Sequence, residues 1–363
     1  MPAFLHRSKW VLASAVFSVV GIVAIAVILW SARGRTSATS LADQPRTESV
    51  SFQAGGNRLA GTLTLPGKPG VYPAVVFING SGASDRTGGG LFPALWQEFT
   101  RRGFACLSWD RPGVGSSTGD FEAQSFPNRA DEVLAAVASL RGRTDIKRDH
   151  VGVWGFSQGA TVAPLAASQS NDIAFVIAVS GCQTPAWKQD LYRVEAELRA
   201  DGFNSTHMKE AVEFAETRMD LMRSGGLFEE LDENQRGLLG RPWFEYVQYC
   251  DRKRFESGKR MVNFDPAPHW EMVHCPVLAV FGDKDTSCHV EPSVAVIRQG
   301  LEKAGNRDLT VKVFANASHR LTAAQTGGRK EAEQQAKSRR AGAAPDFVPG
   351  YVTTMADWLA AHR

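Results

Sequence analysis

The most constraining feature of this sequence is a serine held between two glycines in residues 151–167, VGVWGFSQGATVAPLAA. The first residues of this stretch are apolar, as in a buried strand, and its alanine-rich end is typical of a helix. No conventional turn sequence separates the two. Gly155 and Gly159 therefore indicate a sharp strand-to-helix bend in which the neighbouring backbone leaves no room for a side chain on either side of Ser157.

A G-x-S-x-G sequence at such a bend is a nucleophile elbow. The bend lifts the Ser157 hydroxyl clear of the backbone. It also places the N–H of Gln158, at the positive end of a helix, where an oxyanion would form. Five-residue matches arise by chance in many chains, so the strand before the motif and the helix after it are what favour the functional interpretation.

Short apolar runs recur along most of the chain, separated by helical or glycine-rich segments. Such continuous apolar strands are typical of a parallel sheet that is covered on both faces. Before them, residues 49–65 alternate apolar and polar side chains around Gly55-Gly56-Asn57, which predicts a hairpin. We therefore expect a doubly wound α/β fold that starts with an antiparallel hairpin. The apolar runs are residues 74–78, 104–109, 151–156, 175–180, 277–281 and 309–314, with helices expected at 94–102 and 129–140.

Residues 187–269 break this alternation, because they have helical periodicity, many charges and no strand-like run. An insertion between the sixth and seventh strands would lie above their carboxyl ends, where open α/β sheets bind ligands. Its large apolar side chains could line an acyl pocket, but we favour the interpretation that they form the insertion's own core. They are Trp187, Phe203, Met208, Phe214, Met222, Phe228, Trp243, Phe244 and Tyr246. Residues 325–343, rich in both charge signs, are expected to form a solvated helix or loop.

The N-terminus carries an uncharged, predominantly apolar run of 21 residues, 10–30, with basic residues on both sides. This length is sufficient to cross a bilayer, so we expect an uncleaved membrane helix within residues 1–35 and a polar tether over 36–47. The alternative is a cleaved signal peptide, and residues 40–42 fit the cleavage pattern. We expect the catalytic domain outside the cytoplasm, although the flanking charges determine the orientation poorly.

Composition excludes some classes of function. A formal net charge of +3 is too small to indicate a nucleic-acid partner. The five cysteines show no C-x-x-C spacing, so we expect no metal and no cofactor. Cys106 and Cys182 lie in or beside apolar runs and are interpreted as small buried hydrophobic residues.

A serine nucleophile needs a histidine base and an acid that orients it. Of the eight histidines, only His289 and His319 are placed to follow strand ends at the elbow's edge of the sheet. We favour His319, because it comes just after the last apolar run and keeps the order serine, acid, histidine. The acid should follow the preceding strand, where the sequence offers Asp283 and Asp285. We favour Asp285, because the chain must first turn at Gly282 before a side chain can point back.

A second oxyanion donor is expected in the loop after the strand at 74–78. Glycines at 80 and 82 allow the backbone to approach a ligand, and we favour the N–H of Ser81, with Gly82 as the alternative. Two Asp-Arg pairs nearby, 85–86 and 110–111, are interpreted as internal loop ion pairs, because neither supplies a nucleophile or a base.

These residues together resemble the α/β-hydrolase superfamily over residues 49–363. The segments INGSGASDR, SWDRPGVGSSTGDF, GFSQGA, FGDKD and ASHRL occur in that order and are similar to bacterial serine esterases related to acyl-peptide hydrolases and dienelactone hydrolases. The resemblance implies Ser157, Asp285 and His319 as a triad, with Ser81 and Gln158 as oxyanion donors. Asn79 departs from it, since many relatives have histidine there. Relatives also carry a helical insertion at 187–269, which divides the hydrolase core into residues 48–186 and 270–363.

The sequence thus predicts a serine hydrolase of short to medium carboxylic esters that works without a cofactor, its partners being a small ester substrate and the membrane. A peptidase or an acyltransferase would use the same triad. The alternative from another class is a binding protein on a hydrolase fold that has lost catalysis.

Overall fold

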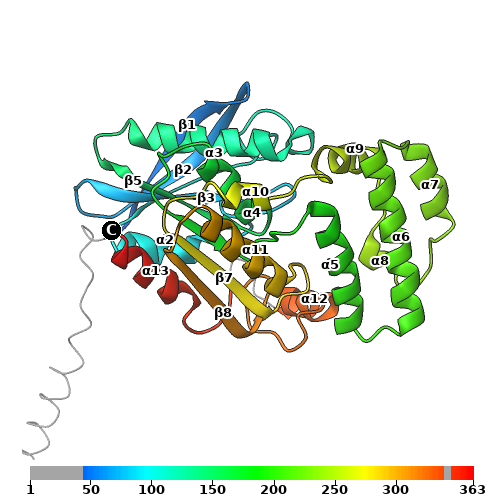
Figure 1. Ribbon diagram of the computed structural model, residues 1–363. Coiled ribbons are helices and arrows are strands. Elements are labelled where there is room, and N and C mark those ends of the chain that lie inside the picture. The colour runs from blue at the N-terminus through cyan, green and yellow to red at the C-terminus, as the bar shows by residue number, and fades with distance from the viewer. Residues whose placement is uncertain (1–43, 339–344) are drawn as a thin grey trace, which may run out of the picture. The chain divides into compact units, whose positions relative to one another are not determined.

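The computed structural model describes residues 44–338 and 345–363, and the fold is given for those residues (Figure 1). The predicted membrane helix, its cleavage-site alternative and nearly all of the tether lie outside the described residues. Among the helices that are described, none has the length and apolar character needed to span a bilayer.

The described chain is built on one eight-stranded sheet with the order β1-β2-β4-β3-β5-β6-β7-β8. β1 pairs with β2, and β2 with β4, in antiparallel fashion, whereas the five remaining neighbouring pairs are parallel. The predicted mostly parallel sheet with an N-terminal hairpin is therefore confirmed. The strands are β1 Arg46–Ala54, β2 Asn57–Leu65, β3 Tyr72–Ile78, β4 Ala105–Trp109, β5 Ile146–Phe156, β6 Val176–Val179, β7 Val277–Lys284 and β8 Leu309–Ser318.

The central strands are apolar on both faces because each face carries its own layer of helices. In β3, Ala74, Val76 and Ile78 pack into one buried cluster, while Val75 and Phe77 pack into the other. This division follows the period of two along a strand. The first cluster lies under α3, α4, α10 and α11, and the second lies against α2 and α13 (Figure 1). These helices are α2 Phe92–Arg101, α3 Phe126–Arg141, α4 Gln158–Ser168, α10 Ala267–Trp270, α11 Val290–Lys303 and α13 Tyr351–Ala361, with a short 3₁₀ helix, η2, at Phe121–Ala123.

The segment predicted to be a helical insertion contains helices and no strand, and we call residues 186–261 the cap. It projects from one side of the sheet domain (Figure 1). Its large apolar residues, including Phe214, Trp243 and Phe244, pack with one another in a separate buried cluster. This packing fits the interpretation that they form the cap's own core. The cap helices are α5 Ala186–Ala200, α6 Ser205–Ser224, α7 Phe228–Arg236, α8 Phe244–Val247 and α9 Arg252–Met261.

The cap is joined to the sheet domain by α5 and by a late helix, α12 (Arg329–Ser338). On α5, the Gln189 side chain donates to Ser287 O at 3.2 Å, in the loop after β7. On α12, the Lys330 backbone N–H donates to the Asp201 carboxylate at 3.1 Å, at the end of α5. The prediction of a solvated helix at 325–343 is met by α12, which has no buried residue, while residues 339–344 lie outside the described part.

Candidate active site

Ser157 occupies the one-residue joint between β5 and α4. Its backbone has φ 52° and ψ −121°, a left-handed value that a residue with a side chain rarely adopts. The Ser157 N–H donates to Val179 O at 2.9 Å, which ties the joint to the end of β6. A Cβ at Gly159 would lie 2.2 Å from Ile78 O, and one at Gly155 would lie 2.4 Å from Gly159 O. Both positions therefore require glycine for the bend to form.

His319 and Asp285 lie in line with the Ser157 hydroxyl. His319 Nε2 is 3.0 Å from Ser157 Oγ. The other ring nitrogen, Nδ1, is 2.8 Å and 3.0 Å from the two carboxylate oxygens of Asp285. The structure thus brings together three side chains that follow the carboxyl ends of β5, β7 and β8. In this arrangement the histidine can accept the serine proton while the carboxylate fixes the orientation of the ring.

Asp285 is held by its own loop. Its side chain is fully buried, and its Oδ1 accepts the backbone N–H groups of Ser287 and Cys288, each at 2.8 Å. Tyr192 of α5 donates its hydroxyl to Asp285 O at 3.0 Å. Burial, together with the negative charge of Asp285, raises the pKa of Tyr192 to about 12, so the phenol keeps its proton at neutral pH. The cap therefore helps to position the acid.

The two alternatives from the sequence point elsewhere. Asp283 Oδ1 accepts the Ala317 N–H at 3.3 Å, which links the ends of β7 and β8. His289 precedes α11, and its ring stacks on Tyr192 with centroids 4.3 Å apart. Among the described residues, neither side chain forms a hydrogen bond with Ser157 or His319, so the geometry favours the pair Asp285 and His319.

The loop after β3 lies beside the elbow. A Cβ at Gly80 would be 3.6 Å from Ser157 Cβ, so the Gly80 backbone passes directly against the serine. Ser81 follows in this loop and is exposed. Gln158 directly follows Ser157 as the first residue of α4, where a backbone N–H has no partner within the helix. The assignment of Ser81 and Gln158 as oxyanion donors stays a prediction.

Asn79, the residue that departs from the family pattern, anchors this loop. It is buried, and its Nδ2 donates to Asp85 O and Trp109 O, each at 3.1 Å. The amide therefore fastens the loop to the end of β4. This contact offers a structural reason for asparagine at that position.

The prediction of ion pairs between Asp85 and Arg86 and between Asp110 and Arg111 is wrong about the partners. Arg86 forms its ion pair with Asp110, at 2.6 Å, rather than with its neighbour. Asp85 instead accepts the N–H of Thr87 at 3.0 Å, as in an Asx turn. Arg111 donates to Gly82 O at 2.8 Å. The pairing crosses between two loops because these loops meet at the same edge of the sheet.

Sequence reasoning missed Arg129 and the side chain of Gln158. The Arg129 guanidinium donates to Gln158 Oε1 and to Asn79 O, and the residue is only 2% exposed. A signal was present: Arg129 stands four residues before Val133 and so lies on the buried stripe of its helix.

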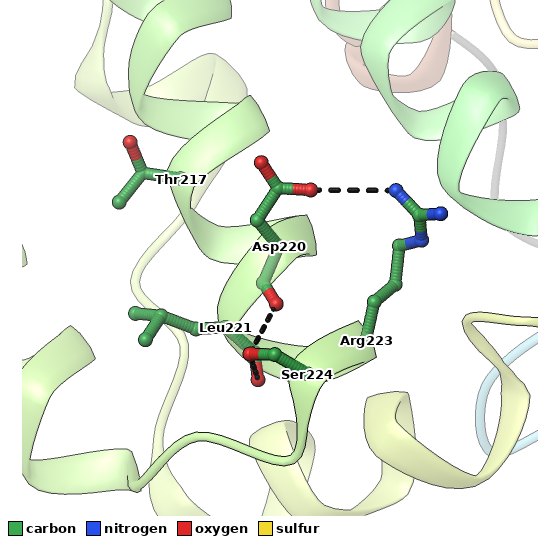
Figure 2. A pocket seen from close by; sticks show the side chains of 5 residues that line it. All are labelled: Thr217, Asp220, Leu221, Arg223 and Ser224. Atoms are coloured by element: carbon green, nitrogen blue, oxygen red, sulfur yellow. Dashed lines mark hydrogen bonds and ion pairs between the residues drawn. The ribbon is translucent and has the colours of Figure 1, made fainter.

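A pocket of about 620 Å³ lies away from this cluster, on α6 in the cap (Figure 2). Arg223 and Asp220 form an ion pair across it at 3.3 Å, and Ser224 Oγ donates to Asp220 O at 2.7 Å. With Thr217 and Leu221 they make up its lining, which contains no base beside the serine. We therefore do not assign this pocket to catalysis. Within residues 44–338 and 345–363, no group of three or more metal-ligating side chains is placed to hold a metal ion.

The mostly parallel sheet, the β5–α4 elbow and the cap after β6 define an α/β-hydrolase fold. Residues 75–326 match the model of the alpha/beta hydrolase family. This range covers well over half of the sequence, and the chain belongs to that family.

Individual relatives are distant. Acyltransferase drtE of Aspergillus calidoustus is 24% identical over 217 residues, which are 56% of this chain and 67% of that protein. A 2,6-dihydroxy-pseudo-oxynicotine hydrolase superposes with a TM-score of 0.53 at 18% identity, covering 87% of this chain and 68% of that one. Est1E from Butyrivibrio proteoclasticus, with ferulic acid bound, gives a TM-score of 0.50 at 17% identity, covering 86% and 96%. The two structures share the fold with this chain.

Proposed function

We propose that this protein is a serine hydrolase of carboxylic esters with short to medium acyl chains. The observation that carries the proposal is the hydrogen-bonded series from Asp285 through His319 to Ser157 Oγ. A base within hydrogen-bond reach of a serine, itself oriented by a buried carboxylate, is the arrangement that nucleophilic catalysis needs. The strained backbone of Ser157 supports the same conclusion, because such strain gathers at functional positions.

The reaction would take place in two halves. Ser157 Oγ attacks the ester carbonyl while His319 Nε2 accepts its proton, and Asp285 stabilises the imidazolium that forms. The backbone N–H groups of Ser81 and Gln158 hold the negative oxygen of the tetrahedral intermediate. His319 then protonates the departing alcohol, which leaves an acyl group on Ser157. Water, deprotonated by His319, releases the acid and restores the serine.

A panel of p-nitrophenyl esters of graded acyl length, assayed beside aminoacyl p-nitroanilides, tests this proposal. Wild type and Ser157→Ala are compared at equal concentration. We expect turnover of the short and medium esters by wild type, and a loss of about 10⁴-fold or more in Ser157→Ala. Amide turnover without ester turnover would identify a peptidase instead. Equal activity in both proteins would contradict catalysis by Ser157 and favour a binding protein.

An acyltransferase is the second candidate, and the similarity to Acyltransferase drtE favours it. Such an enzyme would form the same acyl-serine but pass the acyl group to an alcohol or an amine in place of water. Adding graded concentrations of a primary alcohol to the ester assay separates the two outcomes. Free acid as the only product supports hydrolysis, whereas a new ester formed at the expense of the acid supports transfer.

The N-terminal sequence leads us to propose that this activity is anchored at a membrane, outside the cytoplasm. The proposal rests on the apolar residues 10–30 and their basic flanks. Membrane fractionation, followed by protease treatment of intact cells and of lysed cells, tests it. Recovery of the full-length chain in the soluble fraction would contradict the anchor.

A further inference from the structure

Arg129 is a buried arginine whose guanidinium contacts the residue that follows Ser157. It lies in the first turns of α3, and only 2% of its surface is exposed. One arm of its guanidinium, Nη1, donates to the side-chain oxygen of Gln158. The other arm, Nη2, donates to the main-chain carbonyl of Asn79. A single planar group thus bridges two segments that are far apart in the sequence.

Both segments carry a proposed oxyanion donor. Asn79 O is the last carbonyl before Gly80 and Ser81, so the bond to Nη2 fixes the peptide that leads into the donor loop. Gln158 contributes its own N–H, and the bond to Nη1 fixes the side chain of that same residue. Because the guanidinium is a rigid fork, the spacing of its two arms constrains the distance between the two segments. The two segments lie close together, since a Cβ at Gly159, the residue after Gln158, would be 2.7 Å from Asn79 O.

The charge of Arg129 is not matched by a direct ion pair. Within the described part of the chain, no carboxylate lies within 4.0 Å of its guanidinium. Glu132, one turn further along α3, instead accepts from Trp109 Nε1 at 3.2 Å and from the side chain of Gln124. Both acceptors of Arg129 are neutral oxygens. The buried carboxylate of Glu132 attracts the guanidinium, but burial and the repulsion from Arg111 outweigh that attraction and lower the pKa of Arg129. Burying this charge is therefore costly, and proteins retain such costs at functional sites.

The positive charge of Arg129 would stabilise negative charge that develops at the neighbouring oxyanion hole. A fixed positive charge behind the two donor segments, in a region from which water is excluded, favours a developing oxyanion more than it favours a neutral ester. We propose that Arg129 is a positioning residue that sets the spacing of the Ser81 and Gln158 donors and supplies positive charge behind them. This inference rests on the proposed ester hydrolysis.

The test compares wild type with Arg129→Met, which removes the fork and the charge but keeps most of the bulk. Arg141→Met is the matched control on the same helix, because Arg141 donates to Arg148 O at 2.8 Å and pairs with Asp172, away from the elbow. For each protein, kcat and KM are measured with the best p-nitrophenyl ester. Inhibition by a trifluoromethyl ketone is measured as well, because its adduct with serine carries an oxyanion. Thermal unfolding reports whether each variant is folded.

We expect Arg129→Met to lower kcat by about 10²–10³-fold, with KM little changed, because the lost interactions act in the transition state. The trifluoromethyl ketone should bind more weakly by a similar factor. Arg141→Met should match wild type. A folded Arg129→Met with wild-type kcat and inhibitor affinity, or with only a raised KM, would overturn the inference.

Two further variants keep the test decisive if Arg129→Met does not fold. Arg129→Lys retains the charge without the fork, and we expect it to lower kcat by about tenfold. Gln158→Met removes the acceptor of Nη1 and keeps the backbone N–H, and we expect a similar loss. Wild-type kcat in both folded variants would overturn the positioning role. Wild type is assayed first: a wild type without ester turnover contradicts the proposed function, whereas an active wild type with unaffected variants contradicts this inference alone.

Discussion

The candidate site depends on the backbone conformation of Ser157. Ser157 has a left-handed φ of 52° because it is the single residue between the end of β5 and the start of α4. Gly155 and Gly159 make room for this joint, and the sequence pattern alone identified both of them. The same local chemistry directed us to Asp285 over Asp283, since a turn at Gly282 must come before the acid.

Gly159→Ala tests the claim that the joint excludes side chains. The new Cβ would lie 2.2 Å from the backbone oxygen of Ile78, which cannot move without disturbing β3. We expect the free energy of unfolding to fall by about 3 kcal/mol. Gly142→Ala is the control, because Gly142 has φ −78° and a Cβ there would be 3.6 Å from Ser139 O, an ordinary contact. It should gain about 0.4–1 kcal/mol. Urea unfolding measures both, and equal stabilities would contradict the close packing.

Asp285→Asn and Asp283→Asn form a matched pair for the acid. Asparagine at 285 keeps the shape but loses the charge that fixes the His319 ring, so kcat should fall by about 10³–10⁴-fold. Asparagine at 283 keeps an oxygen for the Ala317 N–H and should leave kcat near the wild-type value. Steady-state ester kinetics separate the two variants. The reverse order of effects would make Asp283 the acid.

Other residue-level features depend on distances that no local pattern contains. The Arg86–Asp110 pair joins two loops, so reading each Asp-Arg dipeptide by itself gave the wrong partners. Arg129 was visible only as a charge on an apolar helix stripe. Its two acceptors become neighbours only when β3, α3 and α4 come together.

Among the elements, strands and helices were predicted where their pattern was continuous. The apolar runs located the centres of β3 to β8, but β5, β7 and β8 extend further than these runs because their ends are partly exposed and carry polar residues. The segment 187–269 was correctly predicted to be helical. Its contacts with the acid loop through Tyr192 and Gln189 depend on how α5 approaches the sheet, which no periodicity reveals.

Glu331 tests how the first turn of α12 is stabilised. Burial alone would raise its pKa, but hydrogen bonds from the backbones of Gln325, Thr326 and Gly327 and from the Thr326 hydroxyl outweigh that effect and lower the pKa to about 2. A lowered pKa means that the carboxylate stabilises the fold above its ordinary pKa of 4.5, and that this contribution is lost as the pH falls towards 2.

We therefore expect Glu331→Gln to be less stable than wild type by about 1 kcal/mol at pH 7. The difference should shrink as the pH falls from about 4.5 towards 2, because the wild-type carboxylate then takes up its proton. Urea unfolding across this range is the measurement. Glu333→Gln is the control, because Glu333 only pairs with Arg329 on the surface, and its effect should be smaller. A stability difference that does not change with pH would contradict the role of the charge.

Across the whole molecule, the site exists because parallel strands end at one edge of the sheet. Each of the three candidate residues follows a strand: Ser157 follows β5, Asp285 follows β7 and His319 follows β8. Their order along the chain could therefore be predicted from the sequence. The order of strands in the sheet could not, since β3 lies between β4 and β5 only through crossovers that the helices impose. The separate core of the cap likewise follows from packing among its own helices, whose large apolar residues form one buried cluster apart from those of the sheet.

Activation of Ser157 by His319 is the central claim, and a fluorophosphonate probe measures it most directly. The probe is incubated with wild type, Ser157→Ala and His319→Gln, and the adduct is located by mass spectrometry of tryptic peptides with fragmentation. We expect one adduct in wild type, on Ser157 within the peptide of residues 149–188, none in Ser157→Ala, and greatly slowed labelling in His319→Gln. An adduct on another residue, or labelling of His319→Gln at the wild-type rate, would contradict it.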